Sequence, residues 1–187
     1  MSNVMHKLIF TSLALLSFSA SADESIPLKP IVEYQRINSS IGQFRFELKI
    51  LDARSKPIYG EILIETLDGK SIQTIPVENW WFDPSFDFID LNDDGYTDLL
   101  FYNTQAGFGA GPSSVADVFL YIPKLGKFVK SKTLTGIGNI SKGKAKGCVN
   151  VNYKSSMAGY TDEEWCFNLK TGHWKMVKST TNEPSEE

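Results

Sequence analysis

Residues that alternate between apolar and polar recur along this chain, and they limit the fold more than any other feature of the sequence. The alternation is clearest over residues 44–50, and residues 61–65, 119–122 and 148–153 are further short apolar-rich segments that we predict to be strands. A period of two residues is typical of half-buried β-strands, whereas no segment of residues 23–187 carries the sustained apolar stripe of an amphipathic helix. The sequence therefore predicts an all-β fold: a single domain of antiparallel hairpins, arranged as blade-like or propeller-like sheets or as a sandwich.

One hairpin pattern occurs twice. The pattern covers residues 119–128 and again residues 165–174. In each copy, two aromatic residues are separated by one position, and a glycine follows after four further residues. A third aromatic residue lies two positions after the glycine. Alternating aromatics can face a core, and Gly126 and Gly172 suit turn positions that require a positive φ. The spacing lies in the range of propeller blades. Two copies are too few for a closed propeller, so we interpret them as repeated hairpins of one β domain.

The N-terminus has the three parts of a secretory signal peptide. Lys7 supplies a positive charge, residues 8–18 form an apolar run too short to span a bilayer, and residues 20–22 match a cleavage site. We expect residues 1–22 to be removed during export. The mature protein is expected in the periplasm or secreted, with no membrane segment.

Beyond the expected cleavage site, the sequence predicts a β domain over residues 23–178 and a disordered polar tail over residues 179–187. The whole chain has a formal net charge of -3. This charge offers no basic surface for nucleic acid, and it weakly favours a basic protein partner.

The chain has two cysteines, Cys148 and Cys166. In an oxidising compartment an even pair predicts a disulfide. A reactive thiol pair is the alternative, which the absence of a CxxC spacing disfavours.

The segment from residue 90 to residue 98 reads DLNDDGYTD, which is the spacing of a calcium-binding loop. Calcium takes roughly six to eight oxygen ligands. Gly95 permits the sharp turn that such a loop needs, and without a cation the four acids of the segment would repel one another. The predicted ligands are the side chains of Asp90, Asn92, Asp94 and Asp98 and the carbonyl oxygen of Tyr96.

This loop differs from a helix-loop-helix EF-hand. Phe101 occupies the position of the bidentate glutamate, and residues 86–89 and 99–102 are predicted strands rather than helices. Asp98 must therefore close the cage. We expect a structural rather than a catalytic ion, because protein ligands would fill most of its coordination sphere. An Asx-rich turn without metal is the alternative.

No catalytic residues are predicted, and the chain is not expected to be an enzyme. His173 is the one histidine of the expected mature chain, which disfavours zinc or copper sites. No nucleophile-elbow motif supports a Ser-His-acid triad. Trp80 and Trp81 could form a sugar-stacking platform, although such aromatics more often lie in a core.

Residues 155–164 join the two cysteine-bearing segments and are predicted to form a long loop. A disulfide at its base would lower the cost of ordering it on binding. An ordinary solvated loop is the alternative, and the glycine-rich segment 106–114 is a second candidate contact. The predicted partner-binding residues are Gly159, Tyr160, Asp162 and Glu163.

The sequence DFIDLNDDGYTDLL over residues 87–100 resembles FG-GAP-type calcium motifs. With the glycine-rich segment and the turn at Gly126, residues 80–177 are similar to a family of small exported bacterial proteins, the periplasmic lysozyme-inhibitor-like proteins. Some of these serve as immunity proteins against lysozyme-type effectors of a type IV secretion system.

The resemblance implies a lysozyme-like peptidoglycan hydrolase as partner, blocked by a loop inserted into its cleft. Residues 157–160 match that loop best, but they depart from the Ser-Gly-x-Tyr signature of related inhibitors. Ala158 replaces the serine, and no residue separates Gly159 from Tyr160. Lysozymes are commonly basic, so an acidic loop would be steered toward them.

Overall fold

The computed structural model describes residues 30–52, 59–78, 84–103, 115–156 and 159–182, and within these ranges it contains twelve strands and no helix. The strands form three four-stranded antiparallel sheets, each made of consecutive strands in up-and-down order. The first sheet contains β1 (Ile31–Asn38), β2 (Gly42–Asp52), β3 (Tyr59–Thr66) and β4 (Ser71–Glu78). The second contains β5 (Ser85–Ile89), β6 (Asp98–Asn103), β7 (Val115–Ile122) and β8 (Lys127–Lys130). The third contains β9 (Asn139–Lys142), β10 (Cys148–Lys154), β11 (Tyr160–Asn168) and β12 (His173–Asn182).

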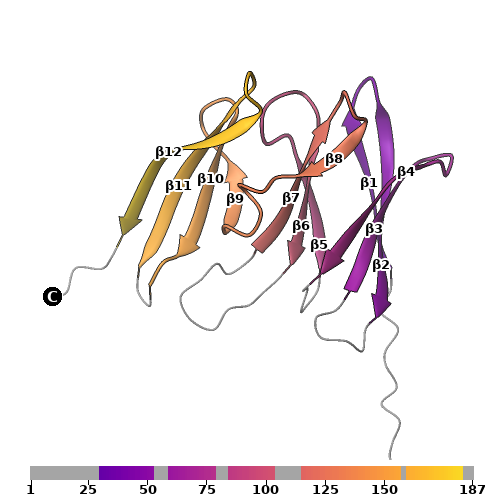
Figure 1. Cartoon of the computed structure of the whole chain (residues 1–187), viewed down its shortest axis with the longest axis horizontal. Coiled ribbons are helices and arrows are strands. Elements are labelled where there is room, and N and C mark those ends of the chain that lie inside the picture. Colours follow the sequence, from indigo (N-terminus) through magenta and orange to yellow (C-terminus); the bar gives the residue numbers. More distant parts are fainter. Residues whose placement is uncertain (1–29, 53–58, 79–83, 104–114, 157–158, 183–187) are drawn as a thin grey trace, which may run out of the picture.

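The three sheets stand side by side in chain order, as Figure 1 shows from the indigo first sheet to the yellow end of the third. The all-β fold built from antiparallel hairpins is therefore confirmed, and each sheet is a blade-like meander. All of the strand segments predicted from alternation lie within these strands or overlap them.

A first hydrophobic core lies between the first and second sheets. Phe46, Ile62 and Ile64 of the first sheet share this core with Leu99 and Phe101 of the second sheet, and all five side chains are fully buried. In β2 the inward positions alternate with polar ones, which is the reason that the sequence pattern identified this strand.

A second core lies between the second and third sheets. Leu100 and Val118 of the second sheet pack in this core with Ile140, Val149 and Val151 of the third. The second sheet is thus buried on both faces. Strands buried on both faces read as continuous apolar runs, and β6 and β7 do so.

The hairpin repeated in the sequence is present at equivalent places in two sheets. Residues 119–128 form the β7–β8 hairpin and residues 165–174 form the β11–β12 hairpin. Their turn glycines have positive φ, 61° at Gly126 and 71° at Gly172. The first sheet has the same hairpin, β3–β4, with a φ of 84° at Gly69. The aromatic pattern is absent from this third hairpin, because Ile62 and Ile64 replace the first two aromatics and Ser71 replaces the last.

Two boundaries predicted from the sequence are wrong. Residues 160–164 belong to β11 rather than to a loop, so the connection from β10 is confined to residues 155–159. β12 continues through Asn182, so residues 179–182 are strand rather than disordered tail. These polar segments pair with each other, Tyr160 opposite Asn182, and backbone pairing orders them without an apolar alternation.

Some predictions fall outside the described residues. These are the signal peptide over residues 1–22, the pair Trp80 and Trp81, the glycine-rich segment 106–114, residues 157 and 158 of the expected inserting loop, and residues 183–187 of the expected tail. The part of the chain that the structure describes contains no helix that could cross a membrane.

Candidate metal centre

The predicted metal loop connects β5 to β6, and Asp98 is the first residue of β6. Its backbone takes a left-handed conformation at two positions, with φ of 56° at Asp93 and 88° at Gly95. Glycine adopts this conformation without steric cost, and Asp is one of the few other residues that tolerate it. The turn that a cation-binding loop requires is therefore formed by these two residues.

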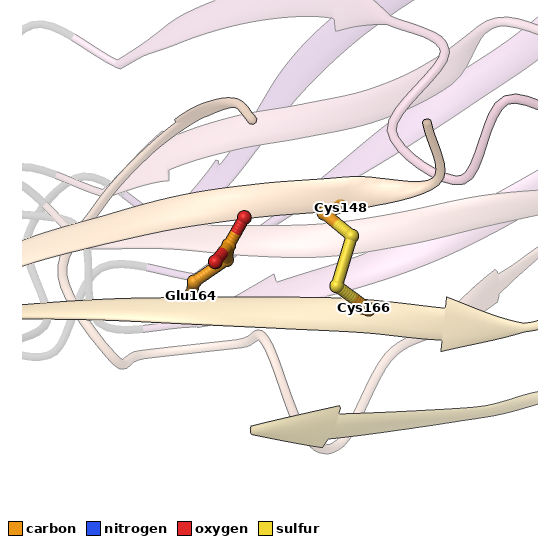
Figure 2. Close-up of side chains that lie close together, drawn as sticks. All are labelled: Cys148, Glu164 and Cys166. Carbon is orange, nitrogen blue, oxygen red and sulfur yellow. A yellow bond between two sulfur atoms is a disulfide. The ribbon is translucent and has the colours of Figure 1, made fainter. Parts of the chain in front are cut away.

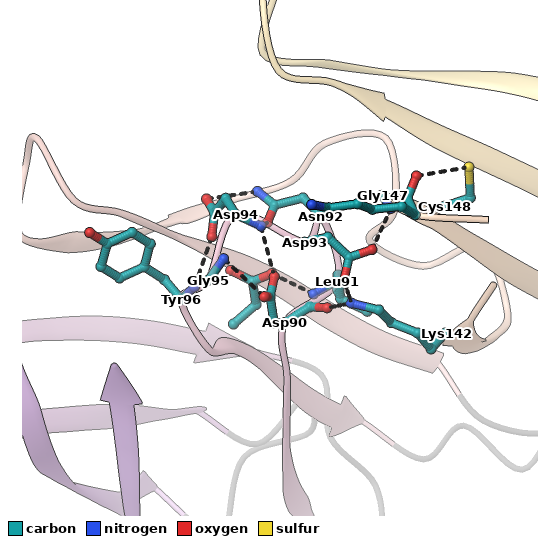
Figure 3. A network of polar contacts seen from close by, with 12 residues as sticks. Asp90, Leu91, Asn92, Asp93, Asp94, Gly95, Tyr96, Lys142, Gly147 and Cys148 are labelled. Carbon is teal, nitrogen blue, oxygen red and sulfur yellow. Dashed lines mark hydrogen bonds and ion pairs between the residues drawn. The ribbon is translucent and has the colours of Figure 1, made fainter. Parts of the chain in front are cut away.

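The side chains of Asp90, Asn92 and Asp94 turn inward and accept hydrogen bonds from the backbone of the loop (Figure 3). The Asp90 carboxylate accepts from the backbone N–H groups of Asp94 at 3.2 Å and Gly95 at 3.0 Å. Asn92 Oδ1 also accepts from the Asp94 N–H, at 3.2 Å, and Asp94 Oδ1 accepts from the Tyr96 N–H, at 3.0 Å. These Asx-type turns close the loop on itself.

Asp98 is the most buried acid of the site, with no exposed surface. Its Oδ2 accepts a hydrogen bond from the Leu91 N–H at 3.0 Å, and its Oδ1 accepts one from the Tyr121 N–H of β7 at 2.9 Å. The pKa of Asp98 is raised to about 8, chiefly because burial disfavours the charged form. The nearby carboxylates of Asp94 and Asp90 contribute to this rise, against the effect of the two hydrogen bonds.

The loop is hydrogen-bonded to the first sheet. Asn38 Nδ2, at the end of β1, donates to the Gly95 carbonyl oxygen at 2.7 Å. The backbone N–H of Thr97 donates to the Ile37 carbonyl at 2.8 Å, and the Thr97 hydroxyl donates to the Arg36 carbonyl at 3.1 Å. The end of β1 is thus attached to the second half of the loop.

The loop is also attached to the third sheet. The Lys142 ammonium of β9 lies 2.5 Å from the Asp93 carboxylate and donates to the Asp90 carbonyl oxygen. The backbone N–H of Gly147 donates to the other Asp93 oxygen (Figure 3). The pKa of Asp93 is lowered, first by the Lys142 hydrogen bond and then by that from Gly147. Asp93 points away from the loop interior and joins the loop to the third sheet.

The donor set fits calcium in its chemistry. The loop offers hard oxygen atoms from four side chains and one carbonyl, which are the ligands that calcium prefers. Asp98 is a buried acid next to two further acids, and a divalent cation would offset their mutual repulsion. The residues that could hold the ion are those predicted: Asp90, Asn92, Asp94, Tyr96 and Asp98.

The carboxylates of the loop are not gathered into a tight cluster. Asn92 Nδ2 donates to Asp94 Oδ2 at 3.1 Å. Within the described ranges, the one group of three potential ligand residues with atoms within 4.8 Å of one another lies elsewhere, at Cys148, Glu164 and Cys166 (Figure 2). Both sulfur atoms of that group form a disulfide with an S–S distance of 2.02 Å, so they are not available as thiolate ligands.

The predicted pairing of Cys148 with Cys166 is confirmed. The two residues face each other directly across β10 and β11. Phe167 N–H donates to the Gly147 carbonyl at 2.8 Å. The disulfide therefore lies one residue from Gly147, which contacts the metal loop.

The four residues predicted to bind a partner do not share one surface. Gly159 is buried, Tyr160 is 49% exposed, and Asp162 is exposed on the same face of β11 as Tyr160. Asp162 accepts hydrogen bonds from the side-chain amides of Asn152 at 2.7 Å and Asn182 at 3.2 Å.

Glu163 lies on the opposite face of β11, where it is half-buried. Its carboxylate accepts hydrogen bonds from the Tyr153 hydroxyl at 2.9 Å and from Trp165 Nε1 at 2.8 Å. Glu163 is thus an internal acceptor, whereas Tyr160 and Asp162 remain accessible.

The sequence did not identify Asn38, Lys142 and Gly147 as part of this site. They lie more than fifty residues from their partners in the loop, and no local pattern marks them. His173 is exposed at the start of β12.

Comparisons with protein-family models, with curated proteins and with solved structures find no match to this chain. The proposals that follow therefore rest on the geometry and on the sequence.

Proposed function

We propose that this chain is an exported binding protein in which the loop over residues 90–98 holds one structural calcium ion. The observation that carries the proposal is that this loop is bonded to all three sheets. It contacts Ile37 of the first sheet, Tyr121 of the second and Gly147 of the third. An ion bound here would stabilise the junction of the whole domain rather than one hairpin.

The ion would supply positive charge to the acids of the loop. This charge would favour the ionised form of the buried Asp98 and offset the mutual repulsion of the acids, and binding free energy would become folding free energy. Because the loop residues are occupied in joining sheets, we assign the ion no catalytic step. The disulfide between Cys148 and Cys166 supports an oxidising compartment, in agreement with the predicted export.

The proposed partner is a lysozyme-like peptidoglycan hydrolase, which the protein would inhibit. The resemblance of residues 80–177 to lysozyme-inhibitor-like proteins supports this partner. Tyr160 and Asp162 offer an exposed aromatic ring and an exposed acid on one face of β11. Aromatic residues are enriched among binding hot spots, and an acid suits the basic surface of a lysozyme.

The test combines inhibition and binding assays with a panel of lysozymes and the calcium-loaded protein. We expect Tyr160→Ala to weaken the complex roughly tenfold or more, as is typical of a hot-spot residue. Tyr59→Ala is the matched control, because Tyr59 also begins a strand and is 42% exposed, but in the first sheet. Equal loss in both variants, or no inhibition by the folded wild type, would contradict the inhibitor proposal.

The calcium and inhibitor proposals are separable. Calcium binding without inhibition of any hydrolase would favour the alternative, an FG-GAP-like surface module that binds a different protein or a glycan. Calorimetric titration of calcium into the wild type measures the first proposal without reference to the second.

A further inference from the structure

A cleft of about 330 Å³ lies between the second and third sheets, beside their repeated hairpins. Its walls are apolar and aromatic, formed by Leu120 and Ile122 of β7, Phe167 of β11 and Trp174 of β12. This volume falls in the range of roughly 300–1,000 Å³ that is typical of small-molecule sites. The cleft is separate from the metal loop and from Tyr160.

Among the described residues, the rim of the cleft carries donors and positive charge but no acid. Lys132 and His173 are exposed at its edge, and Ser131 and Thr133 contribute hydroxyl groups. Lys130 also lines the cleft, but its ammonium is paired with Asp117 at 2.9 Å. The absence of acids from the lining is informative, because the chain has more acidic than basic residues, 22 against 19.

The corresponding interface between the first and second sheets is closed. There, the side chain of Gln73 on β4 donates to the Phe128 carbonyl and accepts from the Phe128 N–H, both at 2.9 Å. Phe128 occupies in β8 the position that Trp174 occupies in β12. Between β8 and β12, all of whose residues are described, no such pair of hydrogen bonds is found. The hydrogen bonds that join β4 to β8 thus have no counterpart between β8 and β12, where the cleft lies.

Trp174 carries a polar group that its counterpart Phe128 lacks. The residue is only 9% exposed, and its Nε1–H has no hydrogen-bond partner among the residues that the structure describes. Buried donors are nearly always paired, and an unpaired one costs about 1–3 kcal/mol. Because Trp174 lines the cleft, an acceptor on a bound ligand that reached this N–H would remove that cost.

We infer that this cleft binds a small molecule with an apolar body and one carboxylate group. The apolar body would lie against Phe167 and Trp174, and the carboxylate would be held by Lys132 and His173, with an oxygen available to the indole N–H. Neither calcium nor a hydrolase is needed for this site, so the inference does not depend on the proposed function.

The test is a titration of the ¹⁵N-labelled full chain, observed at the indole N–H signal of Trp174. The Trp174→Phe variant, which installs the residue found at the equivalent position of β8, assigns that signal by its loss. The probes are 3-phenylpropionate, its uncharged amide and propionate. We expect 3-phenylpropionate to shift the signal saturably, and the amide and propionate to bind at least roughly tenfold more weakly, because each lacks one half of the recognised chemistry.

Two variants locate the charge that the probe recognises. The double variant Lys132→Ala/His173→Ala should weaken 3-phenylpropionate binding roughly tenfold, and both residues are exposed, so folding is retained. Lys175→Ala is the matched control, since Lys175 is exposed on the same strand as His173 but does not line the cleft. A signal that does not saturate, an amide that binds equally well, or equal affinity in the double variant and the wild type would each overturn the inference.

Discussion

The side-chain nitrogen of Asn38 lies 2.7 Å from the carbonyl oxygen of Gly95, 57 residues further along the chain. This contact joins the first hairpin of the first sheet to the first hairpin of the second. Gly147, in the first hairpin of the third sheet, makes the corresponding contact with Asp93. The metal loop therefore lies between two neighbouring turns, and its order depends on both.

Asn38→Asp tests the contact with Gly95. The Asn38 Oδ1 atom accepts hydrogen bonds from the Ser40 N–H and hydroxyl, and aspartate keeps this acceptor while it loses the donor to Gly95. We expect the unfolding free energy to fall by about 1 kcal/mol, or roughly 2–4 °C in Tm for a chain of this size. Thermal denaturation measures the change. Asn38→Ala removes all three bonds and should be less stable still, whereas an unchanged Tm in Asn38→Asp would show that the contact does not stabilise the fold.

Calcium removal should lower the stability of the wild type. Calcium at about one hundred times its dissociation constant adds about 2.7 kcal/mol, which corresponds to roughly 5–10 °C in Tm. In Asp94→Asn the calcium-dependent part of Tm should shrink, because the side chain keeps its size and loses its charge. Asp117→Asn is the matched control, since Asp117 of β7 pairs with Lys130 of β8 and is not part of the loop. Identical Tm values of the wild type in calcium and in chelator would exclude the structural ion.

The strands of the three sheets were predictable from the sequence because the apolar pattern of a strand reflects which of its faces are buried. Inward residues such as Phe46 alternate with polar ones in β2, and the two apolar faces of the second sheet appear as continuous apolar runs in β6 and β7. The ligand spacing from residue 90 to residue 98 was equally visible, because all of the oxygen-bearing groups belong to one turn. Both signals are local, and both are set by short-range chemistry.

The remainder depends on contacts between distant segments. Lys142 approaches Asp90 only because β9 follows β8 onto the other face of the second sheet. Residues 160–164 were expected to form a loop, since threonine and three acids show no apolar alternation. They are ordered by pairing with the equally polar end of β12, which no local pattern records. The face of a polar strand is likewise undetermined locally, so Glu163 was assigned to a partner surface although it points inward.

The disulfide should stabilise both the domain and the metal loop. Cys148 and Cys166 are 18 residues apart, and closing a loop of this length contributes about 3 kcal/mol. Cys148→Ser/Cys166→Ser should lower the unfolding free energy by that amount in chemical denaturation. It should also weaken calcium binding, because Gly147 adjoins the disulfide and contacts Asp93. The wild type reduced by a dithiol is the matched comparison, and full calcium affinity in the variant would show that the two sites are independent.

The hydrogen bond between Tyr153 and Glu163 should raise the pH at which the tyrosine ionises. The pKa of Tyr153 lies above its ordinary value, first because its hydroxyl donates to the Glu163 carboxylate and then because of burial. A raised pKa in the folded state means stability that is fully present below the unfolded pKa of about 10 and is lost as the pH rises through the folded pKa. Glu163→Gln removes the charge, so Tyr153 should ionise at a lower pH, as followed by the ¹³Cζ signal of labelled tyrosine. Asp162→Asn is the control. Asp162 lies on the other face of β11, so this variant should leave the titration of Tyr153 unchanged. If Glu163→Gln leaves it unchanged too and weakens a partner complex instead, Glu163 belongs to the binding surface after all.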